Sequence, residues 1–74
     1  MSKGIFTGVN LSAASLEGSD LSDSDLTDAD LAGAVLHGVI LRGAKLKNTD
    51  FRGVYGLPIS KEEARKRGAI IYYR

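Results

Sequence analysis

Bulky apolar residues recur in this chain at every fifth position. A helix advances about 100° per residue, so side chains five apart would point all around its axis. In a strand, an odd spacing would send successive side chains to opposite faces. The period therefore predicts a backbone that turns a corner once per repeat and directs each of these residues, here called centre residues, inward. The ten centre residues are Phe6, Leu11, Leu16, Leu21, Leu26, Leu31, Leu36, Leu41, Leu46 and Phe51.

The other positions of each five-residue unit fit such a corner. Residues two before the centre are small or β-branched, as Ala29 and Ala34 are. Residues two after the centre are Gly, Asp or Asn except at Ala13, and these types tolerate the positive φ of tight turns. The residue directly before the centre is polar in most units and is predicted to point outward: Asn10, Ser15, Asp20, Asp25, Asp30, Lys45 and Asp50.

Segments such as Ala29-Asp30-Leu31-Ala32-Gly33 resemble the A-(D/N)-L-x-x unit of the pentapeptide repeat family. The resemblance covers about fifty of the 74 residues. It implies an all-β solenoid, a right-handed quadrilateral β-helix with four five-residue sides per coil. Ten units would make about 2.5 coils at the sheet spacing of about 4.8 Å. With twenty residues per coil, Phe6 should stack with Leu26 and Leu46.

The chain is expected to form a single domain, 1–74, with the repeat over 4–55 and a C-terminal cap over 56–74. Gly56 falls where a centre residue is due, which breaks the register. Pro58 comes shortly after it, and proline cannot donate to a continuing ladder of backbone hydrogen bonds.

The cap should contain a short helix over about 61–67. Ser60 and Glu63 fit a capping box at its start, and Gly68 is a natural residue just beyond its end. Residues 69–73 read as a short β segment. We expect the helix to cover the apolar layer of the last coil and the β segment to pair along an edge.

The net charge of +1 hides a strong asymmetry. Residues 1–40 carry six carboxylates and one lysine, whereas residues 41–74 carry nine bases and three carboxylates. If copies meet end to end, this asymmetry makes head-to-tail stacking electrostatically possible. There is no cysteine, no apolar run of signal-peptide length and no stretch of about 18 apolar residues that could span a membrane. The sequence thus predicts a soluble, cytoplasmic protein that does not contact membranes.

Nothing in the sequence names a reaction, so we expect no enzyme, no cofactor and no metal site. His37 is the sole histidine and falls at an outward position. The glycines coincide with the five-residue turn and form no phosphate-binding loop. The carboxylates lie on different sides of the coil and are expected to form a solvated acidic rim; they are Asp20, Asp23, Asp25, Asp28 and Asp30.

Candidate interaction surfaces lie outside the core pattern. Val35 and Ile40 are apolar at outward positions, and Val35 shares a column with Tyr55. These three residues could be covered by the C-terminal segment, which we favour, or by a partner. The bases Arg42, Lys47 and Arg52 form a second candidate surface, although they are expected to serve solubility and not nucleic-acid binding. The first coil, which has no evident cap, is the third.

The predicted function is a non-catalytic structural or protein-interaction module. Its partner is not identified by the sequence, and self-association through the first coil is one hypothesis. The resemblance offers an alternative, because quinolone-resistance members of the family bind DNA gyrase by mimicking duplex DNA with a long acidic rod. This chain departs from them in being short and in having divided charge. A weak nucleic-acid-binding module is the remaining alternative.

Overall fold

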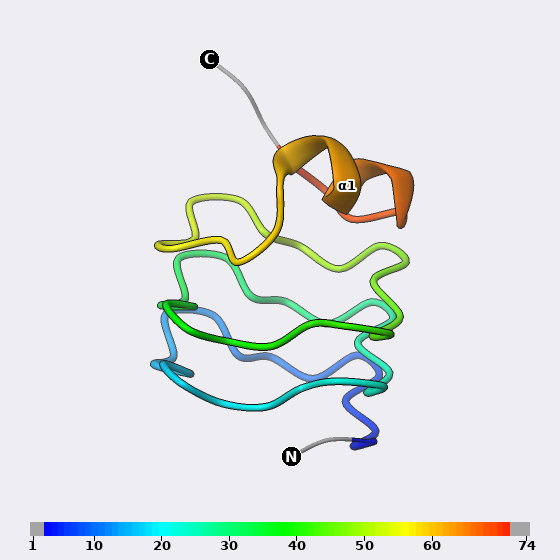
Figure 1. The fold of residues 1–74 in the computed structure, drawn as a ribbon, viewed down its shortest axis with the longest axis horizontal. Helices are drawn as coiled ribbons and strands as arrows, with labels where there is room; N and C mark the ends of the chain where they lie inside the picture. Colours follow the sequence, from blue (N-terminus) through cyan, green and yellow to red (C-terminus); the bar gives the residue numbers. More distant parts are fainter. Residues whose placement is uncertain (1–2, 72–74) are drawn as a thin grey trace.

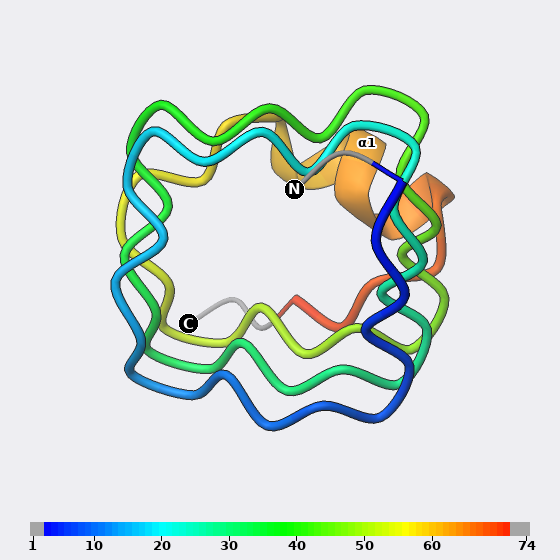
Figure 2. The ribbon, with the colours of Figure 1, turned by 90° about the horizontal axis from the view of Figure 1, so that it is seen from below.

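The computed structural model describes residues 3–71. The chain winds around one axis, and successive turns lie above one another with helix α1 (Lys61–Lys66) at the C-terminal end (Figure 1). Seen along the axis, the coils share one outline with a corner at each bend (Figure 2). The fold is a repeat β-helix.

Neighbouring coils pair through parallel bridges between residues twenty positions apart. Around Lys45, for example, Leu26 N–H donates to the Lys45 carbonyl and Lys45 N–H donates to the Ser24 carbonyl, both at 2.9 Å. A corner comes after each bridge, so within the described residues the paired segments stay shorter than a regular strand. The bridges have the twenty-residue spacing that the sequence predicts: Ile5–Asp25, Asn10–Asp30, Ser15–Val35, Asp20–Ile40, Asp25–Lys45, Asp30–Asp50 and Val35–Tyr55.

Each corner is a tight turn with positive φ two residues after the centre. The carbonyl of the centre residue accepts from the N–H three residues on, as Leu21 does from Ser24 at 3.1 Å. The third residue of this turn, here Asp23 with φ of 58°, adopts the left-handed region. Ala13 adopts it as well, with φ of 60°, although alanine has no side-chain group to compensate for the strain.

The centre residues fill the interior of the coils. Seven of them are buried: Leu21, Leu26, Leu31, Leu36, Leu41, Leu46 and Phe51. Phe6, Leu11 and Leu16 of the first coil are only half-buried, because they have a neighbouring coil on one side alone. Two polar residues at inner positions are fully buried and satisfied: Thr49 Oγ1 donates to the Leu26 carbonyl at 2.6 Å, and Ser24 Oγ accepts from Gly4 N–H at 3.1 Å.

Helix α1 begins and ends with standard caps. Ser60 Oγ accepts from Glu63 N–H at 3.0 Å. At the other end, Gly68 has a φ of 92°. Gly68 N–H donates to the Arg65 carbonyl, and Ala69 N–H donates to the Ala64 carbonyl. This pair of bonds is a Schellman motif. Ala64 is fully buried, so the helix packs one face against the coils.

After α1 the chain returns to the twenty-residue register. Ile70 bridges Asp50 in parallel; its N–H donates to the Thr49 carbonyl at 2.8 Å, and its carbonyl accepts from Phe51 N–H at 3.0 Å. The intervening segment thus replaces most of one coil and then resumes the column of Asn10, Asp30 and Asp50. Tyr72 and Tyr73, the last part of the expected β segment, lie outside the described residues.

The strained corner at Ala13 gives a test of this backbone geometry. Ala13→Gly should raise the free energy of unfolding by about 1 kcal/mol, because glycine adopts positive φ without steric cost. Ala32→Gly is the matched control: Ala32 lies one residue before a corner glycine, has no positive φ, and should lose about 0.5–1 kcal/mol when replaced. Urea denaturation of both variants measures the difference. A loss of stability in both would contradict the corner assignment.

Candidate protein-interaction surfaces

The first coil exposes an edge of unpaired backbone groups beside half-buried apolar side chains. In the second coil, Asp30 N–H donates to the Val9 carbonyl of the first coil at 2.9 Å. The equivalent N–H groups of Asn10 and Ser15 have no acceptor among residues 3–71. Ile5 is 81% exposed on the rim of this coil. We call this surface the first-coil face; its residues are Ile5, Phe6, Asn10, Leu11, Ser15 and Leu16.

Val35, Ile40 and Tyr55 do not form one continuous strip. Val35 and Tyr55 are bridged in one column, whereas Ile40 pairs with Asp20 in the next. Between the two columns lies the corner that carries His37, whose ring packs so closely against Gly56 that a side chain there would clash. Tyr55 remains 62% exposed and Ile40 43% exposed. Within the described residues, the C-terminal segment therefore does not provide the expected full cover for either.

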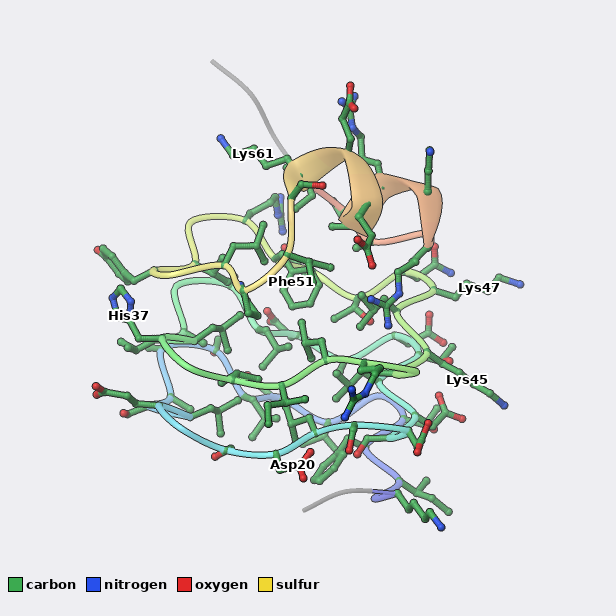
Figure 3. All side chains as sticks on the ribbon, viewed as in Figure 1. Asp20, His37, Lys45, Lys47, Phe51 and Lys61 are labelled. Carbon is green, nitrogen blue, oxygen red and sulfur yellow. The ribbon has the colours of Figure 1, made fainter. Side chains whose placement is uncertain are left out.

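Arg42, Lys47 and Arg52 lie at three successive corners of the last coil and so face different directions. Arg52 is tied to the Asp50 carboxylate by an ion pair of 2.6 Å. Lys47 and the nearby Lys45 point outward on one side, and His37 points outward on the other (Figure 3). The structure thus gives these bases no common surface of the kind that tracks a nucleic-acid backbone.

At the opposite end from the first-coil face, Arg67 replaces a missing backbone donor. In a further coil, the N–H at position 65 would donate to the Ala44 carbonyl, as Lys45 N–H does to Ser24. Residue 65 lies in α1 instead, and the Arg67 Nη2 group donates to the carbonyls of Ala44 and Leu41 at 2.6 and 2.7 Å. The Glu63 carboxylate holds the guanidinium at 3.3 Å, and in the described residues this contact takes the place of its expected return bond to Ser60 N–H.

The carboxylates before the centre residues hold corners in place. Asp20 Oδ1 accepts from both the N–H and the hydroxyl of Ser22, at 3.0 and 2.7 Å, and Asp25 binds Thr27 in the same way. These hydrogen bonds hold the pKa values of Asp20 and Asp25 below their ordinary value of 3.8. The Arg52 guanidinium and N–H do the same for the pKa of Asp50. The carboxylates of Asp20, Asp25 and Asp50 are therefore part of the architecture.

Within residues 3–71, no three His, Cys, Asp or Glu side chains gather in a way that could hold a metal ion. The same part of the chain has no helix with the length and apolar character needed to cross a membrane. Its single helix, α1, has six residues.

The family model described as "Pentapeptide repeats" matches this chain over residues 5–43 and 19–55, with eight copies. The chain belongs to the pentapeptide repeat family. Among solved structures it is similar to a pentapeptide repeat protein from Nostoc Pcc 7120, with 28% identity and a TM-score of 0.42, over 96% of this chain and 74% of that one. The comparison with curated proteins gives no match. Family membership supports the general class of a structural or interaction module.

Sequence reasoning missed two features of these surfaces. It treated Asp20 and Asp25 as outward solvated residues, although Asp and Asn side chains commonly stabilise turns by accepting from the backbone N–H two residues on. It also assigned no bridging role to Arg67. The spacing of Ile70 one full coil beyond Asp50 could have indicated that α1 leaves one side of the last coil without its backbone partner.

The bridging role of Arg67 predicts a large effect from a half-buried residue near the end of the chain. Arg67→Met keeps the aliphatic stem and removes the charged donors, so it should lower the free energy of unfolding by about 2–3 kcal/mol. Lys66→Met removes a neighbouring exposed charge and should change it by less than about 0.5 kcal/mol. Guanidinium denaturation distinguishes the two. If both variants match the parent chain, Arg67 does not hold the coil edge.

The lowered carboxylate pKa values predict a loss of stability in acid. Because the folded pKa values lie below the unfolded value of 3.8, the unfolded chain binds more protons in this range. The contribution is complete above the unfolded value and is lost as the pH falls through the folded values. The triple variant Asp20→Asn, Asp25→Asn, Asp50→Asn keeps the corner acceptors but cannot be protonated, so its melting temperature should fall less between pH 6 and pH 2. Parallel curves for parent and variant would contradict this.

Proposed function

We propose that this chain is a non-catalytic protein-interaction module, a right-handed quadrilateral β-helix of about 2.5 coils that is closed at its C-terminal end by the segment beginning at residue 56. The partner is a second copy, and the contact is the first-coil face. The observation that supports this is that the Asn10 and Ser15 N–H groups have no acceptor within residues 3–71 and lie beside half-buried apolar side chains. An open edge over an apolar layer favours pairing with another chain.

Two first-coil faces related by a two-fold axis can pair. Their edges then run antiparallel, which allows backbone hydrogen bonds across the interface. Contact also removes the half-buried surfaces of Phe6, Leu11 and Leu16 from water, at roughly 25 cal/mol per Å² of apolar area. Glu17, Asp20 and Asp23 would face like charges, but exposed charges repel weakly in salt. Burial therefore outweighs repulsion.

The head-to-tail arrangement suggested by the charge asymmetry has less support. Helix α1 lies over the other end of the stack (Figure 1), so a first coil packed there would meet helix side chains and not a strand edge. The gyrase-mimic alternative has less support because Asp20, Asp25 and Asp50 bind corner N–H groups. The nucleic-acid alternative has less support because Arg42, Lys47 and Arg52 face different directions.

Sedimentation velocity over a hundredfold range of concentration tests the proposal. A monomer–dimer equilibrium that salt strengthens is expected, because salt screens the carboxylates. Ile5→Asp at the rim of the face should weaken the dimer, whereas Tyr55→Asp, another exposed apolar position away from this face, should leave it unchanged. A monomer at every concentration would overturn self-association. Open-ended growth that salt weakens would overturn the two-fold arrangement.

A further inference from the structure

A groove of about 540 Å³ lies between the last coil and the segment that leads into α1. Its floor is the edge formed by residues 39–44, and its far wall is formed by Pro58, Ile59, Glu63 and Arg67. We call it the edge groove. It is separate from the first-coil face, so binding at this groove does not depend on the proposed dimer.

The floor of the edge groove carries three backbone groups without partners. Leu41 N–H, Gly43 N–H and the Val39 carbonyl form no hydrogen bond within residues 3–71. Arg67 Nη2 occupies the Ala44 carbonyl at the end of this edge and also contacts the Leu41 carbonyl. In the preceding coil, the equivalent groups of Ser19, Leu21 and Asp23 bond to the coil twenty residues on. Here the chain leaves the register at Gly56 and does not return until Ile70.

The preceding coil shows which groups the missing strand would offer. Leu21 N–H donates to the Ile40 carbonyl and Asp23 N–H donates to the Arg42 carbonyl, both at 2.9 Å. In return, Ile40 N–H donates to the Ser19 carbonyl at 3.0 Å. Ile40 therefore offers both its N–H and its carbonyl, and Arg42, two positions later, offers its carbonyl. A strand paired with residues 39–44 would offer the same groups.

We propose that the edge groove binds an extended peptide segment of another protein by β-strand addition, parallel to residues 39–44. A first peptide residue would pair with Val39 and Leu41. The residue two positions later would pair with Gly43. Arg67 limits the paired stretch to three peptide residues, because its guanidinium already occupies the next backbone acceptor, the Ala44 carbonyl.

The columns also set the side-chain preference. The first peptide residue comes to lie beside Ile40, whose side chain is 43% exposed, and is therefore apolar. The third comes to lie beside Arg42 and is therefore acidic. The other arginine of the groove, Arg67, is paired with Glu63 and adds little net charge. The partner segment thus has the form apolar–any–acidic.

A single strand fits this edge better than a second copy does. Helix α1 lies above the coil end (Figure 1), so a complete coil cannot stack on residues 39–44. Arg67 also ends the edge after one side of the coil. A short peptide avoids both obstacles.

The test is a titration of the ¹⁵N-labelled full chain with the peptide acetyl-Thr-Ile-Thr-Glu-Thr-amide, monitored by amide NMR. The Leu41 and Gly43 amide resonances should move downfield and saturate, as amides do when they gain a hydrogen bond. Methylating the peptide nitrogen of Ile, which removes the donor to the Val39 carbonyl, should abolish the shifts. Unmoved Leu41 and Gly43 resonances, or shifts confined to Asn10 and Ser15, would overturn the proposal.

A charge exchange tests the register. Arg42→Glu should weaken the Glu-containing peptide about three- to tenfold, and a peptide with Lys in place of Glu should regain that affinity on the variant. Lys47→Glu is the matched control, because Lys47 holds the same repeat position at the next corner. It should leave both affinities unchanged. Equal effects of the two variants would show a general charge attraction and overturn the assigned register.

Discussion

Backbone pairing between coils is the interaction on which this structure depends. Each coil must present its N–H and carbonyl groups to a neighbour twenty residues away, and the corners with positive φ keep these groups in register. The centre residues then stack by necessity, because every side has the same length. Burial of Leu26 or Leu31 stabilises the stack only while this register holds. The same rule makes the two ends of so short a stack its weak points.

The two ends meet this constraint differently. At the C-terminal end three substitutes appear: Ile70 resumes the column of Asp50, the Gly68 carbonyl accepts from Asn48 N–H at 2.8 Å, and Arg67 supplies side-chain donors where a strand is missing. The edge at Leu41 and Gly43 and the first coil have no such substitute among the described residues. Both proposed interaction surfaces lie where the repeat leaves some of its own hydrogen bonds unmade.

The repeat could be predicted from the sequence because one physical requirement fixes it. Ten centre residues at a strict spacing allow only a chain that turns inward, and Gly, Asp or Asn two residues later marks nearly every corner. The Ser60 N-cap and the helix end at Gly68 could also be predicted, because each depends on the residue types within a few positions. The Arg67 bridge could not be predicted in this way, because it depends on where α1 leaves the coil. The separation of Ile40 from Val35 by the His37 corner follows from the repeat itself, because outward residues five positions apart lie on adjacent sides of the coil.

Native-state hydrogen exchange of the dilute monomer tests the central claim most directly. If coils pair in the twenty-residue register, the amides of Leu26, Asp30 and Leu31 should exchange slowly, and those of Asn10, Ser15, Leu41 and Gly43 should exchange at nearly the unprotected rate. Fast exchange at Leu26 and Leu31, or protection at Leu41 and Gly43 equal to theirs, would contradict it.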